Sequence, residues 1–165
     1  MTKIENGTGQ QIDPHEAILK LLDTGEVVYR LIDHEPVYTS QKAEEMTGLK
    51  PSQGAKALLL STGADFVLAV LPGDKRVDFK KIATLLGVKK VKFAGEDEVQ
   101  TVMHCGLGAC YPFGSVVNVR TIVDPLLQQE EEIAFNPGVN EQSIIINGAD
   151  YFEIEKPEVV SIIKE

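Results

Sequence analysis

The 165-residue chain is 43% hydrophobic and 25% charged, a composition that fits one compact domain with a sizeable core. Its formal net charge of -9 argues against broad, nonspecific binding to DNA or other nucleic acid, because that mode depends on many basic residues neutralising phosphates. Residues 1–11 lack the basic flank and apolar core of a signal peptide, and no apolar stretch approaches the roughly 18 residues of a membrane span. We therefore expect a cytoplasmic protein that does not contact a membrane.

The first part of the chain contains one clear helix start. Residues 1–12 show no hydrophobic periodicity and are expected to form a flexible tail before a single domain over residues 13–165. Asp13-Pro14 supplies the N-cap and the first-turn proline of a helix. The elements expected here are a helix from Asp13 to Gly25, a strand over residues 27–32, a turn over residues 34–36, and a helix from Thr39 or Ser40 to near Gly48.

The central part of the chain has the strongest pattern. Two hydrophobic runs separated by Thr62-Gly63-Ala64 predict a hairpin. The stretch from Gly106 to Gly114 is rich in glycine and contains one proline, which predicts a loop with unusual backbone angles. The other expected elements are strands at Ala55–Ser61 and 65–71, a helix that Asp78 caps and that runs through Leu86, a strand at 91–93 and a helix at Glu96–Met103.

The last part of the chain returns to strands. The expected elements are strands at 116–119, 121–123, Glu132–Phe135 and 143–146, followed by a helix over 157–163. Helices and strands are therefore mixed without regular alternation, and no internal repeat is present. This pattern favours an α+β fold with a mixed, strongly curved sheet or partial β-barrel surrounded by helices.

Lys56 is the charge that most needs an explanation, because it stands near the head of an otherwise apolar strand. An ammonium group in apolar surroundings costs several kcal/mol unless water or a partner meets it. Two interpretations follow: the side chain reaches outward to solvent, or it awaits an anionic ligand.

A basic cluster stands out on this acidic chain. Seven of the 16 basic residues fall between positions 75 and 92, and they are Lys75, Arg76, Lys80, Lys81, Lys89, Lys90 and Lys92. A solvated helix face and turn is one interpretation of this basic segment, and a local footprint for an anionic partner is the other.

Two cysteines, Cys105 and Cys110, are too few for a disulfide framework, so we expect thiols. The run from His104 to Cys110 invites a zinc interpretation, but a structural zinc site needs four ligands, and His15 and His34 are distant in the sequence. We expect no metal and no cofactor. A thiol at Cys110, inside the glycine-rich loop, is a candidate for lining a pocket.

Three segments occur in the order and spacing of a known family: residues 54–60, residues 71–78 followed by 85–87, and residues 108–114. They read Gly-Ala-Lys-Ala-Leu-Leu-Leu, Leu-Pro-Gly-Asp-Lys-Arg-Val-Asp with Leu-Leu-Gly, and Gly-Ala-Cys-Tyr-Pro-Phe-Gly. On these segments the chain resembles the YbaK/ProX family of trans-editing aminoacyl-tRNA deacylases, over residues 15–163. The resemblance implies the fold of the editing domain associated with prolyl-tRNA synthetase. It also implies hydrolysis of the ester of a mischarged tRNA carrying a small amino acid such as Ala, Ser, Thr or Cys.

The resemblance implies a set of site residues. Lys56 matches the signature lysine that holds the phosphate or carbonyl end of the substrate, and Gly108 and Gly114 bound the loop whose N–H groups approach the ester. These three are the expected catalytic residues. Expected substrate-binding residues are Thr39, Pro112, Phe113, Asn136, Asn140 and Ser143. The tRNA acceptor end is the expected partner, contacted by Lys75, Arg76, Lys80, Lys81, Lys89 and Lys90, with a synthetase as a second candidate partner.

The chain departs from the family pattern at two positions. Several members carry a histidine where this chain has Asn136, and many alanine-specific members carry an asparagine where it has Ala57. These departures are consistent with an alternative function, a noncatalytic module that binds a tRNA end or a synthetase. A hydrolase acting on free small esters is a third alternative.

No conventional nucleophile is evident in the sequence. There is no Gly-x-Ser-x-Gly elbow, no spaced pair of catalytic carboxylates and no histidine evidently paired with a serine. His34 is interpreted as a surface turn residue rather than a base. Catalysis is therefore expected to rely on positioned water and oxyanion stabilisation.

Overall fold

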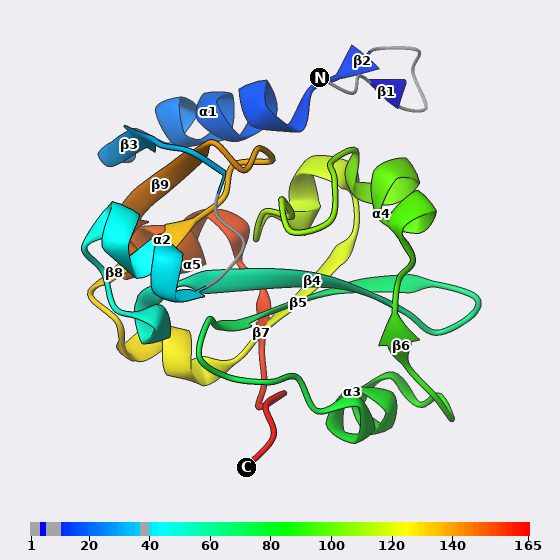
Figure 1. Cartoon of the computed structure of the whole chain (residues 1–165). Helices are drawn as coiled ribbons and strands as arrows, with labels where there is room; N and C mark the ends of the chain where they lie inside the picture. The colour runs from blue at the N-terminus through cyan, green and yellow to red at the C-terminus, as the bar shows by residue number, and fades with distance from the viewer. Residues whose placement is uncertain (1–3, 6–10, 37–39) are drawn as a thin grey trace.

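The structure of the protein is a computed structural model that describes residues 4–5, 11–36 and 40–165 (Figure 1). Thr39, one of the expected substrate-binding residues and one of two candidate helix caps, lies outside the described residues. Within residues 1–12, two short segments pair as antiparallel strands, β1 (Ile4–Glu5) and β2 (Gln11–Ile12).

Two larger sheets make up the body of the domain. The five-stranded sheet has the order β10-β7-β5-β4-β6, and the three-stranded sheet has the order β3-β9-β8. The five strands are β4 (Ala55–Ser61), β5 (Phe66–Pro72), β6 (Lys92–Phe93), β7 (Arg120–Val123) and β10 (Glu158–Val159). The three strands are β3 (Tyr29–Asp33), β8 (Glu132–Phe135) and β9 (Gln142–Asn147).

The two sheets meet at the start of β4. The larger sheet is mixed, because β5 pairs antiparallel with β4 and parallel with β7, whereas all pairs of the smaller sheet are antiparallel. A parallel bridge between Gly54 and Ala134 joins β4 to β8 and so links the sheets. The predicted mixed α+β architecture is confirmed.

Five α-helices and three short 3-10 helices surround the sheets in the described part of the chain. The α-helices are α1 (Pro14–Thr24), α2 (Ser40–Thr47), α3 (Phe79–Leu86), α4 (Glu96–Met103) and α5 (Gly148–Glu155). The 3-10 helices are η1 (Pro51–Gln53), η2 (Gly114–Val117) and η3 (Pro125–Gln129). All of these helices are too short or too polar to traverse a lipid bilayer.

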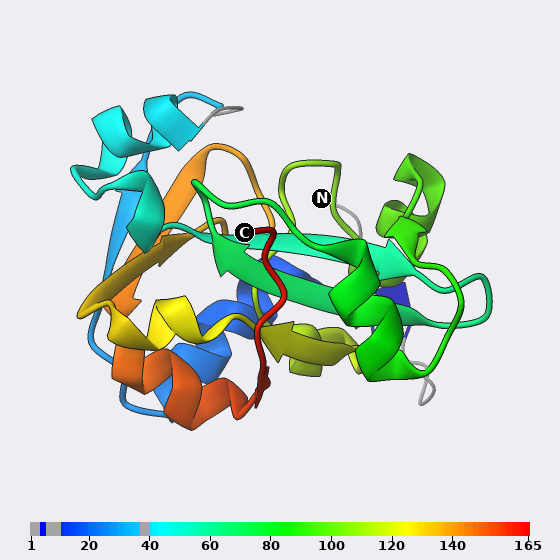
Figure 2. The same ribbon diagram turned by 90° about the horizontal axis from the view of Figure 1, so that it is seen from below.

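The β4–β5 hairpin divides the core into two clusters. Figure 1 shows α3 on one side of the hairpin and α4 on the other, and Figure 2 shows α3 lying over the hairpin when the molecule is seen from below. Alternate residues of β5 enter the two clusters: Val67 and Ala69 pack on the α3 side, and Leu68 and Val70 pack on the opposite side. Both faces of β5 are therefore buried, which accounts for its continuously apolar sequence.

The predicted helix caps of α1 and α3 are confirmed. The side chain of Asp13 accepts a hydrogen bond from the His15 N–H, and the side chain of Asp78 accepts from the N–H groups of Lys80 and Lys81. These bonds satisfy donors that the first turn of a helix leaves unpaired.

Two predicted elements near the end of the chain are wrong. The expected strand at 116–119 is instead η2 at Gly114–Val117, because the chain turns back at Asn118 (φ 60°) and Val119 donates its N–H to the Gly114 carbonyl. The β-branched valines there favour a strand only if a partner strand is available.

The expected final helix at 157–163 is also wrong. The backbone there bonds to its neighbours instead: Val160 donates to the Val123 carbonyl, and Ile162 accepts from Asp78. The helix of this region is α5, which the sequence did not reveal because Asn147-Gly148 resembles a turn. The Asn147 side chain caps the helix by accepting from the Ala149 N–H.

Asp124 anchors this C-terminal segment and provides a stability test. Its 1% exposed carboxylate accepts the Leu126 N–H and the Ile162 N–H, each at 3.0 Å. Asp124→Ala leaves the buried Ile162 N–H and the partly buried Leu126 N–H without their acceptor, and it is expected to lower the free energy of unfolding by about 3 kcal/mol in urea denaturation. Asp78→Ala removes a more exposed cap and is expected to lower it by about 1 kcal/mol. Equal losses in the two variants would contradict the anchoring role of Asp124.

Candidate active site

A cavity of about 390 Å³ opens along the outer edge of β4. Its walls come from the end of α2 with η1, from β4, from the turn after β5, from the end of β6 with part of α4, from the loop after α4, and from the end of β8 with the start of β9. The volume lies within the range of small-molecule sites, about 300 to 1,000 Å³. Segments distant in the sequence therefore converge on one site.

The pairing of β4 explains why the cavity lies there. On its outer edge, β4 is joined to β8 by the bridge at Gly54 and to β6 at Leu60 and Ser61. The two neighbours diverge between these points, and Ala55–Leu59 line the cavity. The site therefore occupies the gap between two diverging strands.

This gap directs main-chain groups into the cavity. The carbonyl of Leu59 accepts a hydrogen bond from the Ala94 N–H at 3.0 Å, so the peptide groups of Leu59 face the outer edge. Peptide groups alternate direction along a strand, and those of Ala57 consequently face the same edge. The N–H of Ala57 is thus a donor on the cavity wall.

Lys56 is held in place at the side of the cavity. Its Nζ donates to the Lys75 carbonyl at 2.6 Å and lies 3.5 Å from the Gly73 carbonyl. Burial lowers the pKa of the half-buried Lys56, an effect that Asp74 opposes and Arg76 reinforces. An ammonium group has three donors, so these two carbonyls leave one for a ligand. Both carbonyls belong to the turn at 73–75, so the Lys56 head group is held against that turn.

Asn136 links the glycine-rich loop to the end of β8. Its Nδ2 donates to the Gly108 carbonyl at 3.0 Å, and both residues line the cavity. Gly108 adopts φ 82°, a backbone angle that favours glycine. The side-chain amide of Asn136 has a second N–H and an acceptor oxygen, Oδ1, beyond this bond.

Ser143 is paired with His34, contrary to the expectation that no histidine meets a serine. The His34 Nε2 lies 2.8 Å from the Ser143 Oγ, and the His34 Nδ1 lies 2.6 Å from the Glu35 carbonyl. Because a carbonyl can only accept, Nδ1 carries the hydrogen in the neutral ring, and Nε2 accepts the hydrogen of the serine hydroxyl. The Ser143 Oγ therefore presents its lone pairs to the cavity that Ser143 lines.

Cys110 also lines the cavity, as the sequence suggested. Its Sγ lies 3.7 Å from that of Cys105, which donates to it. This hydrogen bond raises the pKa of Cys105, with burial acting in the same direction, and lowers the pKa of Cys110. Cys110 therefore contributes a polarisable, acceptor sulfur to the wall.

The structure brings together only some of the predicted site residues. Lys56, Gly108, Asn136 and Ser143 line one cavity. Asn140 is not among the lining residues, and its Oδ1 is buried without a hydrogen-bond partner in the described part of the chain.

Pro112, Phe113 and Gly114 are placed in the core rather than on the cavity wall. Phe113 is fully buried and packs edge-on against Phe135 and Tyr151. The Pro112 carbonyl accepts the Tyr151 hydroxyl at 2.7 Å. The predicted pocket-shaping role of Pro112 and Phe113 is corrected: they pack behind the wall.

Gly114 is required for close packing. Its N–H donates to the Thr121 hydroxyl at 3.1 Å, and a Cβ at this position would collide with that hydroxyl and with the Val119 carbonyl. The neighbouring Ser115 is bound through its N–H and hydroxyl to the Glu155 carboxylate. Close packing in this network accounts for a glycine at position 114, and no contact with a substrate is needed to explain it.

The basic segment borders the cavity at both of its ends. Gly73, just before it, and Phe93, just after it, both line the cavity. Within it, Lys81 is engaged with the C-terminal segment, donating to Ile163 O at 2.9 Å. Exposed basic side chains of this segment are Arg76, Lys80, Lys89, Lys90 and Lys92.

Several lining residues escaped sequence reasoning. The Ala57 N–H is a main-chain group, so the identity of the residue does not indicate that it lines a cavity. Phe93 and Leu107 are apolar side chains exposed at 55% and 53%, which a sequence assigns by default to a core. For Phe93, the only sequence feature that suggested exposure was its place beside Lys92 on a short edge strand.

Comparison with known proteins identifies the class. The model of the aminoacyl-tRNA editing domain matches residues 34–154, and the chain belongs to this family. A multifunctional Ser/Thr-tRNA deacylase, ProXp-y of Escherichia coli strain K12, is 33% identical over 152 residues, covering 89% of this chain and 91% of the relative.

A second relative is the prolyl-tRNA editing protein ProX of Acetoanaerobium sticklandii. It is 28% identical over 151 residues, covering 88% of this chain and 92% of the relative. The same fold occurs in a crystal structure of a protein suggested to be a trans-editing enzyme for prolyl-tRNA synthetase. That structure aligns with a TM-score of 0.81 and 16% identity, over 94% of this chain and 100% of the other.

The two roles considered for Gly114 can be separated by substitution. Gly114→Ala is expected to lower the free energy of unfolding by about 1 to 3 kcal/mol, because the added methyl group overpacks the site. Gly106→Ala is the matched control, since a Cβ there meets no atom of the described residues within 4 Å. Thermal denaturation checks both. Wild-type stability of Gly114→Ala combined with lost activity would contradict the packing role.

Proposed function

We propose that this protein is a trans-editing deacylase that hydrolyses the ester between a mischarged amino acid and the terminal ribose of a tRNA. The observation that carries the proposal is the position of Lys56, half-buried beside the open edge of β4 in a member of the editing-domain family. A fixed ammonium group with a donor to spare suits a carbonyl or phosphate oxygen.

The two walls of the cavity differ in hydrogen-bonding character. One wall offers donors, the Lys56 Nζ and the Ala57 N–H, and the other offers acceptors, the Ser143 Oγ and the Asn136 Oδ1. An aminoacyl ester has a carbonyl that needs donors and an α-ammonium group that needs acceptors. We place the carbonyl at the first wall and the ammonium group at the second.

This orientation accounts for hydrolysis without a protein nucleophile. Water attacks the ester carbonyl, whose oxygen gains negative charge in the tetrahedral intermediate, and the ribose hydroxyl leaves with a proton that the water supplies. Donors at the Lys56 Nζ and the Ala57 N–H would stabilise that oxyanion, and a preorganised donor contributes about 100-fold or more to the rate.

Seryl and threonyl groups are the proposed substrates among Ala, Ser, Thr and Cys. The side-chain hydroxyl of these groups can use acceptors, and the cavity has them at Ser143, Asn136 and the Cys110 sulfur. The name of the Escherichia coli relative, a Ser/Thr-tRNA deacylase, supports the same choice.

Partners and compartment follow from the substrate. We propose that basic side chains of the basic segment contact the acceptor end of the tRNA. The contacting set is the half-buried Lys75 with the exposed Arg76, Lys80, Lys89 and Lys90, whereas Lys81 holds the C-terminal segment. We also propose, on the family resemblance, a cytoplasmic location and docking on a synthetase. Co-elution with purified prolyl-tRNA synthetase tests the docking.

Hydrolysis of a panel of alanyl-, seryl-, threonyl- and cysteinyl-tRNAs tests the proposed activity. Wild type is expected to release serine and threonine, and Lys56→Met is expected to reduce kcat/KM about 100-fold, because an oxyanion donor is lost. Lys50→Met is the matched control, since Lys50 lines the same cavity from the N-cap position of η1. No hydrolysis of any substrate by wild type would leave the noncatalytic module as the correct function.

A second test addresses the Ser143–His34 pair. Ser143→Ala is expected to reduce kcat/KM about 10- to 100-fold, because it removes a charge-assisted hydrogen bond to the α-ammonium group. His34→Ala frees the serine hydrogen and is expected to give a smaller loss. The double variant should match Ser143→Ala, since His34 acts through the serine. Additive losses in the double variant would contradict this arrangement.

A further inference from the structure

Phe93 is an aromatic side chain at the rim of the cavity that the proposed reaction does not use. It is 55% exposed, and the only other large hydrophobic side chain exposed to this degree on the cavity wall of the described chain is Leu107, at 53%. Single exposed apolar residues are common and need no function. Phe93 differs because it also borders the site and the basic segment.

The ring of Phe93 is fixed from one side. It packs edge-on against Phe79 of α3, with ring centroids 5.0 Å apart and an interplanar angle of 80°. Its backbone is held opposite Leu60 of β4, and Ala94 bonds to Leu59. A ring that is packed against Phe79 on one side and exposed on the other is preorganised to bind a flat ligand.

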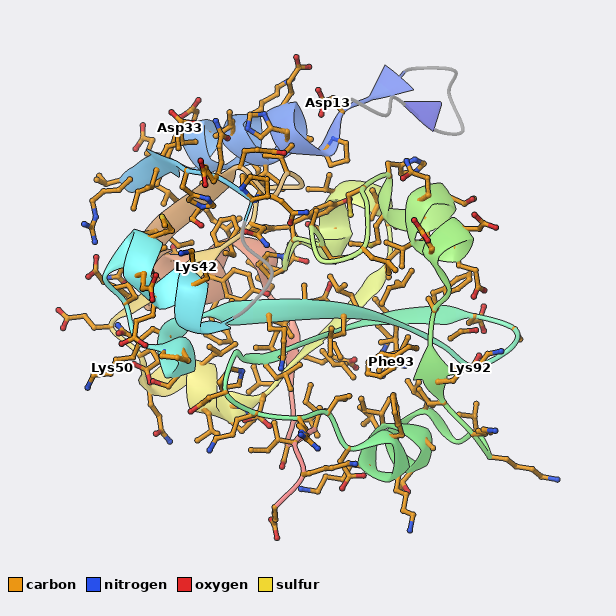
Figure 3. All side chains as sticks on the ribbon, viewed as in Figure 1. Asp13, Asp33, Lys42, Lys50, Lys92 and Phe93 are labelled. Carbon is orange, nitrogen blue, oxygen red and sulfur yellow. The ribbon has the colours of Figure 1, made fainter. Side chains whose placement is uncertain are left out.

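The charges around Phe93 favour an anionic ligand approaching from one direction. Lys92 is adjacent on β6, and Lys89 and Lys90 precede it, all of them exposed. Figure 3 shows Lys92 beside Phe93 at one end of β4 and Lys50 at the other. The acidic side chains Glu96 and Asp97 begin α4 on the far side of Phe93. A phosphate chain would therefore approach over the lysines.

The spacing along β4 separates the two ends of the proposed substrate. Phe93 lies opposite Leu60, four residues along the strand from Lys56. At the usual strand rise this is about 13 Å, enough for a nucleoside between the ester at Lys56 and a base at Phe93.

From these observations we infer that Phe93 is the stacking platform for the unpaired 3′-terminal base of the tRNA, with Lys89, Lys90 and Lys92 along the adjoining phosphates. The inference rests on the proposed function, since it assigns a subsite of the same cavity. Unpaired bases stack on aromatic rings regardless of base identity, because every base has a π-face. Phe93 therefore contributes affinity for the end of the chain and not for its sequence.

A fluorescence experiment tests the inference directly, because the chain contains no tryptophan. In Phe93→Trp the only indole stands at the proposed platform. Titration with uncharged tRNA is expected to quench it, and titration with the same tRNA lacking its terminal adenosine is expected to quench it at least fivefold less. Leu107→Trp, at the equally exposed rim position, is the matched control and should not distinguish the two tRNAs. Equal quenching of Phe93→Trp by both tRNAs would overturn the inference.

Kinetics provide the second readout. Phe93→Leu is expected to raise the KM for aminoacyl-tRNA about tenfold with kcat unchanged, whereas Phe93→Tyr, which keeps a ring, should retain the wild-type KM. A wild-type KM in Phe93→Leu would count against the platform. The two hypotheses fail separately: a wild type that hydrolyses no aminoacyl-tRNA refutes the proposed function, and quenching that does not depend on the terminal adenosine refutes the platform.

Discussion

The incomplete pairing of β4 on its outer edge is the constraint on which the site depends. A strand edge exposes donors and acceptors that need partners. Here β8 meets that edge at Gly54 and β6 meets it at Leu60, while the residues between them line the cavity. The divergence of these two neighbours leaves the Ala57 peptide groups on the cavity wall. The other walls of the cavity are formed by helices, strands and loops that pack around this unpaired stretch of β4.

Lys56 links the unpaired edge of β4 to the basic segment. Its bond to the Lys75 carbonyl fixes the turn at 73–75, where the basic segment begins, and its lowered pKa reflects the cost of holding a charge at half burial. In the proposed binding mode the ammonium group both orders the turn and donates to the substrate carbonyl. The proposed acceptors for the α-ammonium group, Ser143 and Asn136, lie on the opposite wall of the cavity.

Sequence reasoning succeeded where the determinants are local. The hairpin, the caps at Asp13 and Asp78 and the special position of Lys56 all follow from neighbouring residues. It failed where contacts between distant segments determine the structure. The Ser143–His34 pair spans 109 positions, and residues 157–163 are extended because they bond to β7 and to the turn before α3. The glycine-rich loop was located correctly, but only the fold shows that Gly108 faces the cavity whereas Phe113 and Gly114 face the core.

The central claim is that the ester carbonyl binds at the open edge of β4. The most direct test is a crystal structure with a seryl-adenosine analogue in which a stable amide replaces the ester. We expect the analogue's carbonyl oxygen within hydrogen-bond distance of the Lys56 Nζ and the Ala57 N–H, and its ammonium group at the Ser143 Oγ. An analogue bound outside the cavity, or bound in it with the carbonyl at Ser143 and the ammonium group at Lys56, would rule out this binding mode.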